Sequence, residues 1–222
     1  MYKIDEKAKK TTWYKFCLLE VKHFRKMKTI HDFCSQINFN SVLLFDLDGT
    51  LVHTDDANNA AYLLAIKEIL GLDLENQLKS NLRITREKLS SLLPQASQEQ
   101  FEQIIACKEK CFTRFLSYTY VNLELLSVLK KFQTSNELIL ITRSQGERAY
   151  EVLKYHGLQN YFHKIIFQLK DSTSRWSSKI PQLLKDEKYN LQDLFLFENE
   201  EVERVDAQKN GLKTKQIIIV NA

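Results

Sequence analysis

Residues 41–52 read SVLLFDLDGTLV, a short apolar run that ends in two aspartates and a glycine. An apolar run of this length predicts a strand that is covered on both faces, as in a parallel sheet. Asp46 and Asp48 place two carboxylates where the strand ends, and Gly49 permits a sharp turn just beyond them. The segment therefore predicts a buried strand that delivers acidic groups at its carboxyl end.

Further apolar runs follow the first and alternate with segments of helical pattern. Apolar residues recur at helical spacing in residues 144–156 and 178–187, each of which lies between two such runs. Alternating strands and helices are typical of α/β proteins with a parallel sheet. We therefore expect a Rossmann-like α/β fold, with strands at residues 41–45, 138–141, 164–167, 194–197 and 216–220.

The first two expected strands are separated by far more residues than a crossover helix requires. The intervening stretch shows no convincing strand, and its helical segments are residues 57–70, 85–92 and 97–118. We interpret it as a helical cap inserted over the active end of the sheet. The expected organisation is a core of residues 41–56 and 120–222, a cap of residues 57–119 and an N-terminal helical extension of residues 1–40.

The N-terminal extension carries apolar residues at three- and four-residue spacing, which predicts an amphipathic helix that ends before residues 38–40. Residues 1–40 hold nine Lys or Arg against four Asp or Glu, so the basic excess of the chain lies here. The helix either packs on the catalytic domain or, being basic, lies on a membrane surface or binds a partner. Its apolar positions are Trp13, Phe16, Cys17, Val21, Phe24, Met27, Phe33, Cys34 and Ile37.

The composition bounds the class of protein. The chain has 222 residues, of which 44% are hydrophobic, enough for one substantial core and a smaller satellite. No apolar run approaches the roughly 18 to 20 residues of a membrane-spanning helix, and the start lacks a secretory pattern, so we expect a cytoplasmic protein. A net charge of +4 is too small to indicate nucleic-acid binding.

The four cysteines, Cys17, Cys34, Cys107 and Cys111, show no paired spacing typical of zinc sites. Cys107 and Cys111 are four residues apart and fall on one face of the expected helix. We interpret all four as reduced, packed thiols.

The segment Asp46-Leu47-Asp48-Gly49-Thr50-Leu51 resembles the first motif of the haloacid dehalogenase (HAD) superfamily, Asp-x-Asp-Gly-Thr-Leu, at every defined position. The resemblance implies that Asp46 is a nucleophile that forms an aspartyl-phosphate. It implies that Asp48 protonates the leaving oxygen and later activates water, and that Gly49 and Thr50 lie beside the substrate. The chemistry suits the spacing, because neighbouring groups at a strand end can flank a transferred phosphoryl group.

Two further motifs of the superfamily have counterparts. Thr142 ends the strand run at residues 138–141 and resembles the phosphate-binding hydroxyl of the second motif, with Arg143 beside it as a candidate substrate contact. The third element is a lysine that offsets the charge of the carboxylates and the phosphate. Lys179, which opens a helical segment, resembles it in spacing, and Lys170 is the competing candidate.

The fourth motif is where the chain departs from the superfamily. Residues 194–203 read LFLFENEEVE, so Asn199 stands where an aspartate is expected. The resemblance implies a Mg²⁺ ion held by Asp46, the Asp48 carbonyl, Glu198 and Asn199, with Glu203 at another position where the superfamily places an acid. Magnesium prefers hard oxygen ligands, but an amide oxygen contributes no negative charge.

The resemblance covers residues 42–220 and points to the helical-capped phosphoglycolate phosphatase and β-phosphoglucomutase group. It implies a magnesium-dependent phosphatase that acts on a small phosphate monoester. Two alternatives stay open, because a superfamily does not fix a substrate. One is a phosphatase that acts on phosphorylated protein side chains, and the other is a catalytically weakened binding module, which Asn199 and the unusual N-terminus suggest.

Overall fold

The computed structural model describes residues 30–74, 83–167 and 178–221. The chain divides into two compact units, residues 1–38 and 39–222. The described part of the first unit contains helix α2 (Ile30–Cys34). Most of the amphipathic helix expected over residues 13–37 lies outside the described residues, and its packing or membrane role stays a prediction. Among the described residues, no helix has the length and apolar character that crossing a membrane requires.

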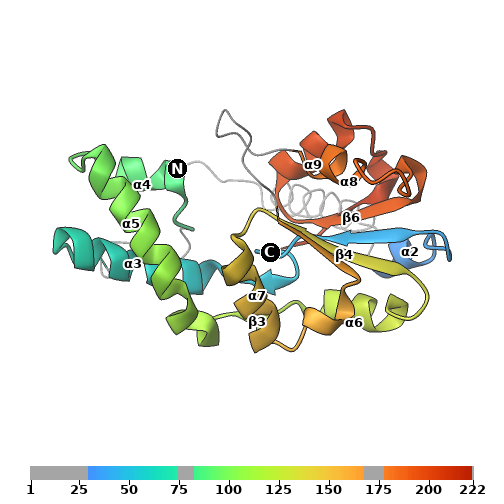
Figure 1. The fold of residues 1–222 in the computed structure, drawn as a ribbon, viewed down its shortest axis with the longest axis horizontal. Helices are drawn as coiled ribbons and strands as arrows, with labels where there is room; N and C mark the ends of the chain where they lie inside the picture. Colours follow the sequence, from blue (N-terminus) through green and yellow to red (C-terminus); the bar gives the residue numbers. More distant parts are fainter. Residues whose placement is uncertain (1–29, 75–82, 168–177, 222) are drawn as a thin grey trace, which may run out of the picture. The chain divides into compact units, whose positions relative to one another are not determined.

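The second unit contains a five-stranded sheet in the order β5-β4-β1-β6-β7, in which every neighbouring pair is parallel (Figure 1). This confirms the predicted α/β class and all five expected strands. The strands are β1 (Val42–Phe45), β4 (Glu137–Thr142), β5 (Lys164–Phe167), β6 (Leu194–Glu198) and β7 (Ile217–Ile219).

The order of the strands in the sheet places β1 at its centre, with β4 and β5 on one side and β6 and β7 on the other. Helices α6 and α7 cover one face, and helices α8 and α9 cover the other (Figure 1). In open α/β sheets of this kind, ligands bind outside the carboxyl ends of the strands, where the strand order reverses. That point here is the end of β1. The helices are α6 (Leu123–Phe132), α7 (Gly146–Tyr155), α8 (Lys179–Leu183) and α9 (Glu201–Lys209).

The interior of the sheet explains why its strands read as continuous apolar runs. Leu43, Leu44 and Phe45 of β1 are completely buried, because helices cover both faces. The Phe45 ring stacks on Phe197 of β6 with centroids 4.6 Å apart. The register pairs the same two residues, so Asp46 and Glu198 leave adjacent strands side by side.

A second cluster of buried side chains forms the core of the cap. Its members are Tyr62, Ala65, Ile66, Ile84, Leu89, Leu93 and Ile104. They belong to α3 (Asp55–Leu70), α4 (Arg86–Leu92) and α5 (Gln98–Cys111), to the segment before α4 and to the residue that follows α4. Ser97 begins α5 with a capping box to Gln100, which satisfies donors at the start of the helix. The helical cap expected from the sequence is therefore present and has its own apolar core.

Three details differ from the sequence-based prediction. The α-helix expected to run to residue 118 ends at Cys111 and continues as the 3₁₀ helix Phe112–Tyr118. Helix α8 ends at Leu183, because a turn then brings Tyr189 back into the core. Two strands were missed, β2 (Val52–His53) and β3 (Tyr120–Val121), which form an antiparallel pair. Strands of two residues are too short to show a period.

Candidate active site

The carboxyl end of β1 presents Asp46 in a nearly closed environment. Asp46 is only 7% exposed, and its backbone N–H donates to the Phe197 carbonyl at 3.2 Å, which continues the ladder between β1 and β6. The chain then turns at Gly49, whose φ of +74° is one that other residues adopt rarely. A Cβ atom on Gly49 would also lie 2.7 Å from the Asn199 side-chain nitrogen, so this position requires glycine twice over.

Lys179, the first residue of α8, contacts Asp46 at the end of β1. Its ammonium group donates to Asp46 Oδ1 at 2.8 Å and to Glu198 Oε2 at 2.6 Å, and lies 3.7 Å from Glu203 Oε2. Lys179 is 3% exposed. Burial alone would lower the pKa of Lys179, but the charges of Asp46, Glu198 and Glu203 raise it, so the side chain is a permanent cation.

The three carboxylates around Lys179 are crowded. Burial is the largest cause that raises the pKa of Asp46, of Glu198 and of Glu203, and the neighbouring negative charges add to it. Lys179 offsets part of the charge on all three, and Arg143 forms an ion pair with Glu203. Three carboxylates thus share two cations, Lys179 and Arg143, and a further cation would relieve this crowding.

Asp48 is held by three side-chain donors, which are Thr54 just before α3, Ser144 in the turn between β4 and α7, and Arg148 of α7. Thr54 Oγ1 donates at 2.6 Å, Arg148 Nη2 donates at 2.5 Å, and the Ser144 hydroxyl forms a short hydrogen bond. Burial opposes ionisation, but the charge of Arg148 and the hydrogen bonds from Ser144 and Thr54 lower the pKa of Asp48 to about 2. Asp48 is thus a carboxylate in this state of the protein.

Thr142 and Arg143 end β4 beside these carboxylates. Thr142 is buried, and its Oγ1 accepts from the Ser144 backbone N–H at 3.1 Å, which fixes the turn into α7. Both residues line a cavity of about 800 Å³ that also contacts Asp46, Asp48 and Lys179. With Glu198, which also lines it, the structure brings six of the predicted site residues to one cavity.

Asn199, Gly49 and Thr50 lie beside this cavity without lining it. The Thr50 hydroxyl donates to Asn199 Oδ1 at 2.8 Å and accepts from the Asn199 backbone N–H at 3.2 Å. Asn199 thereby ties the end of β6 to the turn after β1. Glu198 lines the cavity, but its two oxygens already accept from Lys179 and from the Glu200 backbone N–H. Lys170, the alternative to Lys179, lies outside the described residues.

Sequence reasoning missed several groups on the cavity wall. Arg148 and Ser144 lie just after the second motif, and Glu200 follows Asn199 and accepts from Arg83 of the cap at 2.8 Å. The sequence predicted a cap over the active end of the sheet, but nothing in its pattern marks which residues of the cap or of α7 reach the site. A weak signal exists only for Ser144, which is two residues after Thr142 at a strand end.

The cap supplies the remaining cations of the cavity. Lys108 of α5 is 3% exposed, and its ammonium lies 5.1 Å from the centroid of the Tyr62 ring and 3.2 Å from Glu109 Oε1. Burial, with the charge of Arg148 nearby, lowers the pKa of Lys108 to about 8. Glu109 Oε2 lies 3.9 Å from Arg148, so the cap and the core meet through charged groups at the cavity.

Comparisons with known proteins bear on the family and the fold of the chain. A family model described as haloacid dehalogenase-like hydrolase matches residues 43–217. No protein of curated function matches the chain. Many solved structures do, and at the identities given below the likeness shows the fold alone.

Three of these structures illustrate the match. A haloacid dehalogenase-like family hydrolase from Streptococcus pneumoniae has a TM-score of 0.63 at 17% identity, covering 81% of this chain and 83% of that one. CbbY from Rhodobacter sphaeroides, solved with phosphate, has a TM-score of 0.62 at 17% identity, covering 78% and 84%. A provisionally named phosphatase from Clostridium difficile has a TM-score of 0.63 at 18% identity, covering 78% and 82%.

Proposed function

Since the chain belongs to the haloacid dehalogenase-like hydrolase family, we propose that it hydrolyses a phosphate monoester, with Asp46 as the nucleophile. One observation carries the proposal. The buried Asp46 carboxylate lies 2.8 Å from the Lys179 ammonium, at a cavity that Thr142 and Arg143 also line. A carboxylate nucleophile needs donors around the group that it accepts, and these three side chains offer them to phosphate oxygens.

The reaction that follows has two displacements. An oxygen of Asp46 attacks phosphorus, the bond from phosphorus to the ester oxygen breaks, and Asp48 gives a proton to the departing oxygen. Asp48 then takes a proton from water, whose oxygen attacks the phosphorus of the aspartyl-phosphate. Inorganic phosphate leaves and Asp46 is regenerated. Lys179 holds Asp46 in place and offsets the charge of the incoming phosphoryl group.

Arg148 governs the protonation of Asp48 in this scheme. With the Arg148 guanidinium 2.5 Å away, Asp48 is ionised, which suits its second role as the base that activates water. The first role needs Asp48 protonated. A phosphoryl group that enters the cavity attracts the guanidinium of Arg148, and Asp48 can then hold the proton that it donates to the leaving oxygen.

The strand ends fit a magnesium ion. The acidic lining groups include Asp46, Glu198, Glu200 and Glu203, which offer the hard oxygen donors that Mg²⁺ prefers. These four carboxylates outnumber the three cations that pair with them, which are Lys179, Arg143 and Arg83. We propose that Asp46, the Asp48 carbonyl and Glu200 would hold the ion. When bound, it offsets the repulsion between Asp46 and a phosphate dianion.

In this proposal, Glu200 supplies the metal-binding carboxylate that is missing because Asn199 stands where an aspartate is expected. Asn199 is bonded to Thr50 beside the cavity, and Glu198 is bonded to Lys179, whereas Glu200 lines the cavity with its side chain 40% exposed. We expect Glu200→Gln to raise the magnesium concentration for half-maximal activity about tenfold or more, since it removes a charged ligand. The measurement is a magnesium titration of phosphate ester hydrolysis.

Two control variants separate the metal role of Glu200 from its ion pair with the cap. Glu201→Gln changes an exposed neighbour on α9 and should leave the magnesium curve unchanged. Arg83→Gln breaks the ion pair to Glu200 without removing the carboxylate, so it should not raise the magnesium requirement. A wild-type curve for Glu200→Gln, together with a shifted curve for Glu198→Gln, would return the metal role to Glu198.

Asp48→Asn should lower the turnover of an alkyl phosphate by about a hundredfold or more, because an amide cannot supply or accept the proton. The loss should be smaller for an aryl phosphate in the first displacement, since an aryloxide leaves without a proton. The measurement is single-turnover release of the alcohol or phenol. Equal losses for both esters would contradict the role of Asp48 as the acid.

The position of the cap favours a small substrate. Tyr62, Arg86, Lys108 and Glu109 of the cap line the same cavity as Asp46, so a substrate bound there would contact both the cap and the core. A panel of phosphorylated metabolites and phosphopeptides, assayed with magnesium, tests this. Preference for phosphopeptides would support the protein phosphatase alternative. Binding of phosphate esters without turnover would support the binding module.

A further inference from the structure

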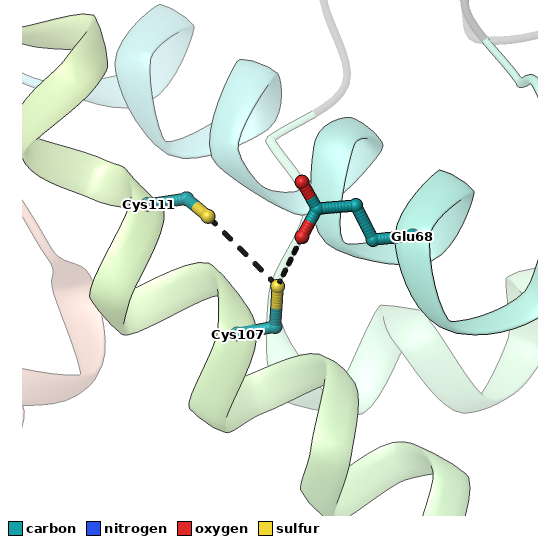
Figure 2. A group of neighbouring side chains, drawn as sticks. All are labelled: Glu68, Cys107 and Cys111. Carbon is teal, nitrogen blue, oxygen red and sulfur yellow. Dashed lines mark hydrogen bonds between the residues drawn. The ribbon is translucent and has the colours of Figure 1, made fainter.

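Two thiols and a carboxylate converge within the cap. Cys107 and Cys111 project from α5 toward Glu68 of the neighbouring helix α3 (Figure 2). The Cys107 sulfur lies 3.1 Å from Glu68 Oε2 and 3.8 Å from the Cys111 sulfur. The three ligand atoms all lie within 4.8 Å of one another. None of the three residues lines the cavity at the strand ends, so this cluster is separate from the phosphate site.

Helix packing places the cluster. The spacing of four residues puts both cysteines on one face of α5, and α3 packs along that face. Both cysteines are partly buried, whereas Glu68 is exposed, so an ion in solution can reach the cluster. The sequence showed the cysteine pair, but the third ligand comes from a helix 39 residues earlier in the chain.

The distance between the two sulfurs matches one edge of a tetrahedral zinc site. Zinc binds thiolate sulfur at about 2.3 Å and carboxylate oxygen at about 2.1 Å, which at tetrahedral angles separates two sulfurs by about 3.8 Å and a sulfur from an oxygen by about 3.6 Å. The two sulfurs of the cluster are already 3.8 Å apart. Glu68 Oε2, at 3.1 Å from Cys107, needs to move outward by about half an ångström.

The same geometry disfavours a disulfide. A disulfide requires an S–S bond of about 2.0 Å and Cβ atoms about 3.5 to 4.5 Å apart. Residues four apart on a helix have Cβ atoms about 5 to 6 Å apart, so oxidation would distort α5. A metal ion bridges the existing separation without that distortion.

We propose that Glu68, Cys107 and Cys111 bind a zinc ion, with water in the fourth position. Thiolates select borderline-soft ions such as zinc over magnesium, whereas the carboxylates at the strand ends suit magnesium. The two sites thus select different metals by the chemistry of their ligands. A bound zinc ion would link α3 to α5 and would stabilise the cap in addition to its apolar core.

Cobalt(II) titration of the full-length protein tests the proposal, because cobalt in a thiolate site gives a sulfur-to-metal charge-transfer band that carboxylates cannot produce. We expect this band in the wild type and its competition by zinc. Cys107→Ser and Cys111→Ser should each weaken binding more than about a hundredfold, and Glu68→Gln about tenfold with the band retained. The controls Cys34→Ser and Glu102→Gln, outside the cluster, should bind as the wild type does.

A second measurement uses the wild type alone, so it stands even if a cysteine variant does not fold. Zinc should slow alkylation of Cys107 and Cys111, counted by peptide mass spectrometry, while Cys17 and Cys34 serve as internal references. Asp46→Asn should show the same protection, since the cluster is separate from the strand ends. Absence of a charge-transfer band in the wild type, its survival in both cysteine variants, or unchanged alkylation with zinc would each overturn the proposal.

Discussion

Asp46→Asn should lower phosphate ester turnover by about ten-thousandfold or more while the fold is retained. The substitution removes the attacking carboxylate and keeps its size, and loss of a nucleophile typically has an effect of this order or larger. Stability should not fall. Asp46, Glu198 and Glu203 crowd one ammonium, and burial raises the pKa of Asp46, so a neutral amide relieves charge repulsion. We expect an unchanged or higher thermal unfolding temperature.

The measurement is hydrolysis of an aryl phosphate alongside thermal unfolding of the same preparations. Asp56→Asn is the matched control, because it makes the same substitution at an exposed position on α3 outside the cavity. It should leave both quantities unchanged. Wild-type turnover by Asp46→Asn would remove Asp46 from the chemistry altogether.

Lys179→Met should lose both activity and stability. The substitution keeps the length of the side chain but leaves Asp46, Glu198 and Glu203 without their shared cation in a buried setting. Removing one partner of a buried ion pair destabilises a protein by about 3 to 5 kcal/mol. Denaturant unfolding measures this loss. Lys188→Met, which breaks an exposed pair with Glu137 at 3.0 Å, should cost no more than about 1 kcal/mol.

The loss in Lys179→Met should grow with pH. A carboxyl whose pKa is raised in the folded state binds more protons folded than unfolded, so stability falls as pH rises above the unfolded pKa. The pKa of Glu198 is raised even though Lys179 lies beside it. Lys179→Met removes the positive charge that opposes this shift, so the pKa of Glu198 should rise further. Unfolding measured at acidic and mildly alkaline pH should show the larger destabilisation at the higher pH. An equal loss at both would contradict the electrostatic role of Lys179.

The sheet and the central site residues follow from the sequence because parallel strands end at one edge. Asp46, Thr142 and Glu198 each follow or end an apolar run, and pairing of the adjacent strands brings them together. Their proximity can therefore be predicted without knowing the conformation of the loops. Lys179 could be chosen because it opens a helical segment before the strand expected at residues 194–197. Its ammonium lies 2.8 Å from Asp46 in the structure. The catalytic roles of these residues remain predictions.

The contacts that the sequence did not predict depend on geometry between elements. Arg148 reaches Asp48 from the first turn of α7, and this contact depends on how that helix sits over the strand ends. Which of Asn199 and Glu200 faces the cavity depends on the backbone path after β6, and neighbouring residues on an extended chain point to opposite sides. Glu68 meets Cys107 only because α3 packs on α5.

The most direct test of the central claim is to find the phosphoryl group on the protein. Asp48→Asn, incubated with an aryl phosphate and magnesium, should accept the phosphoryl group because aryloxide leaves unaided, and should release it slowly because no base activates water. Intact mass should show one phosphoryl adduct, which the double variant with Asp46→Asn should lack. Borohydride reduces an aspartyl-phosphate to homoserine and releases the phosphate, so peptide mapping after reduction should find homoserine at position 46. A phosphoryl group on another residue, or none on the Asp48→Asn protein, would contradict the account.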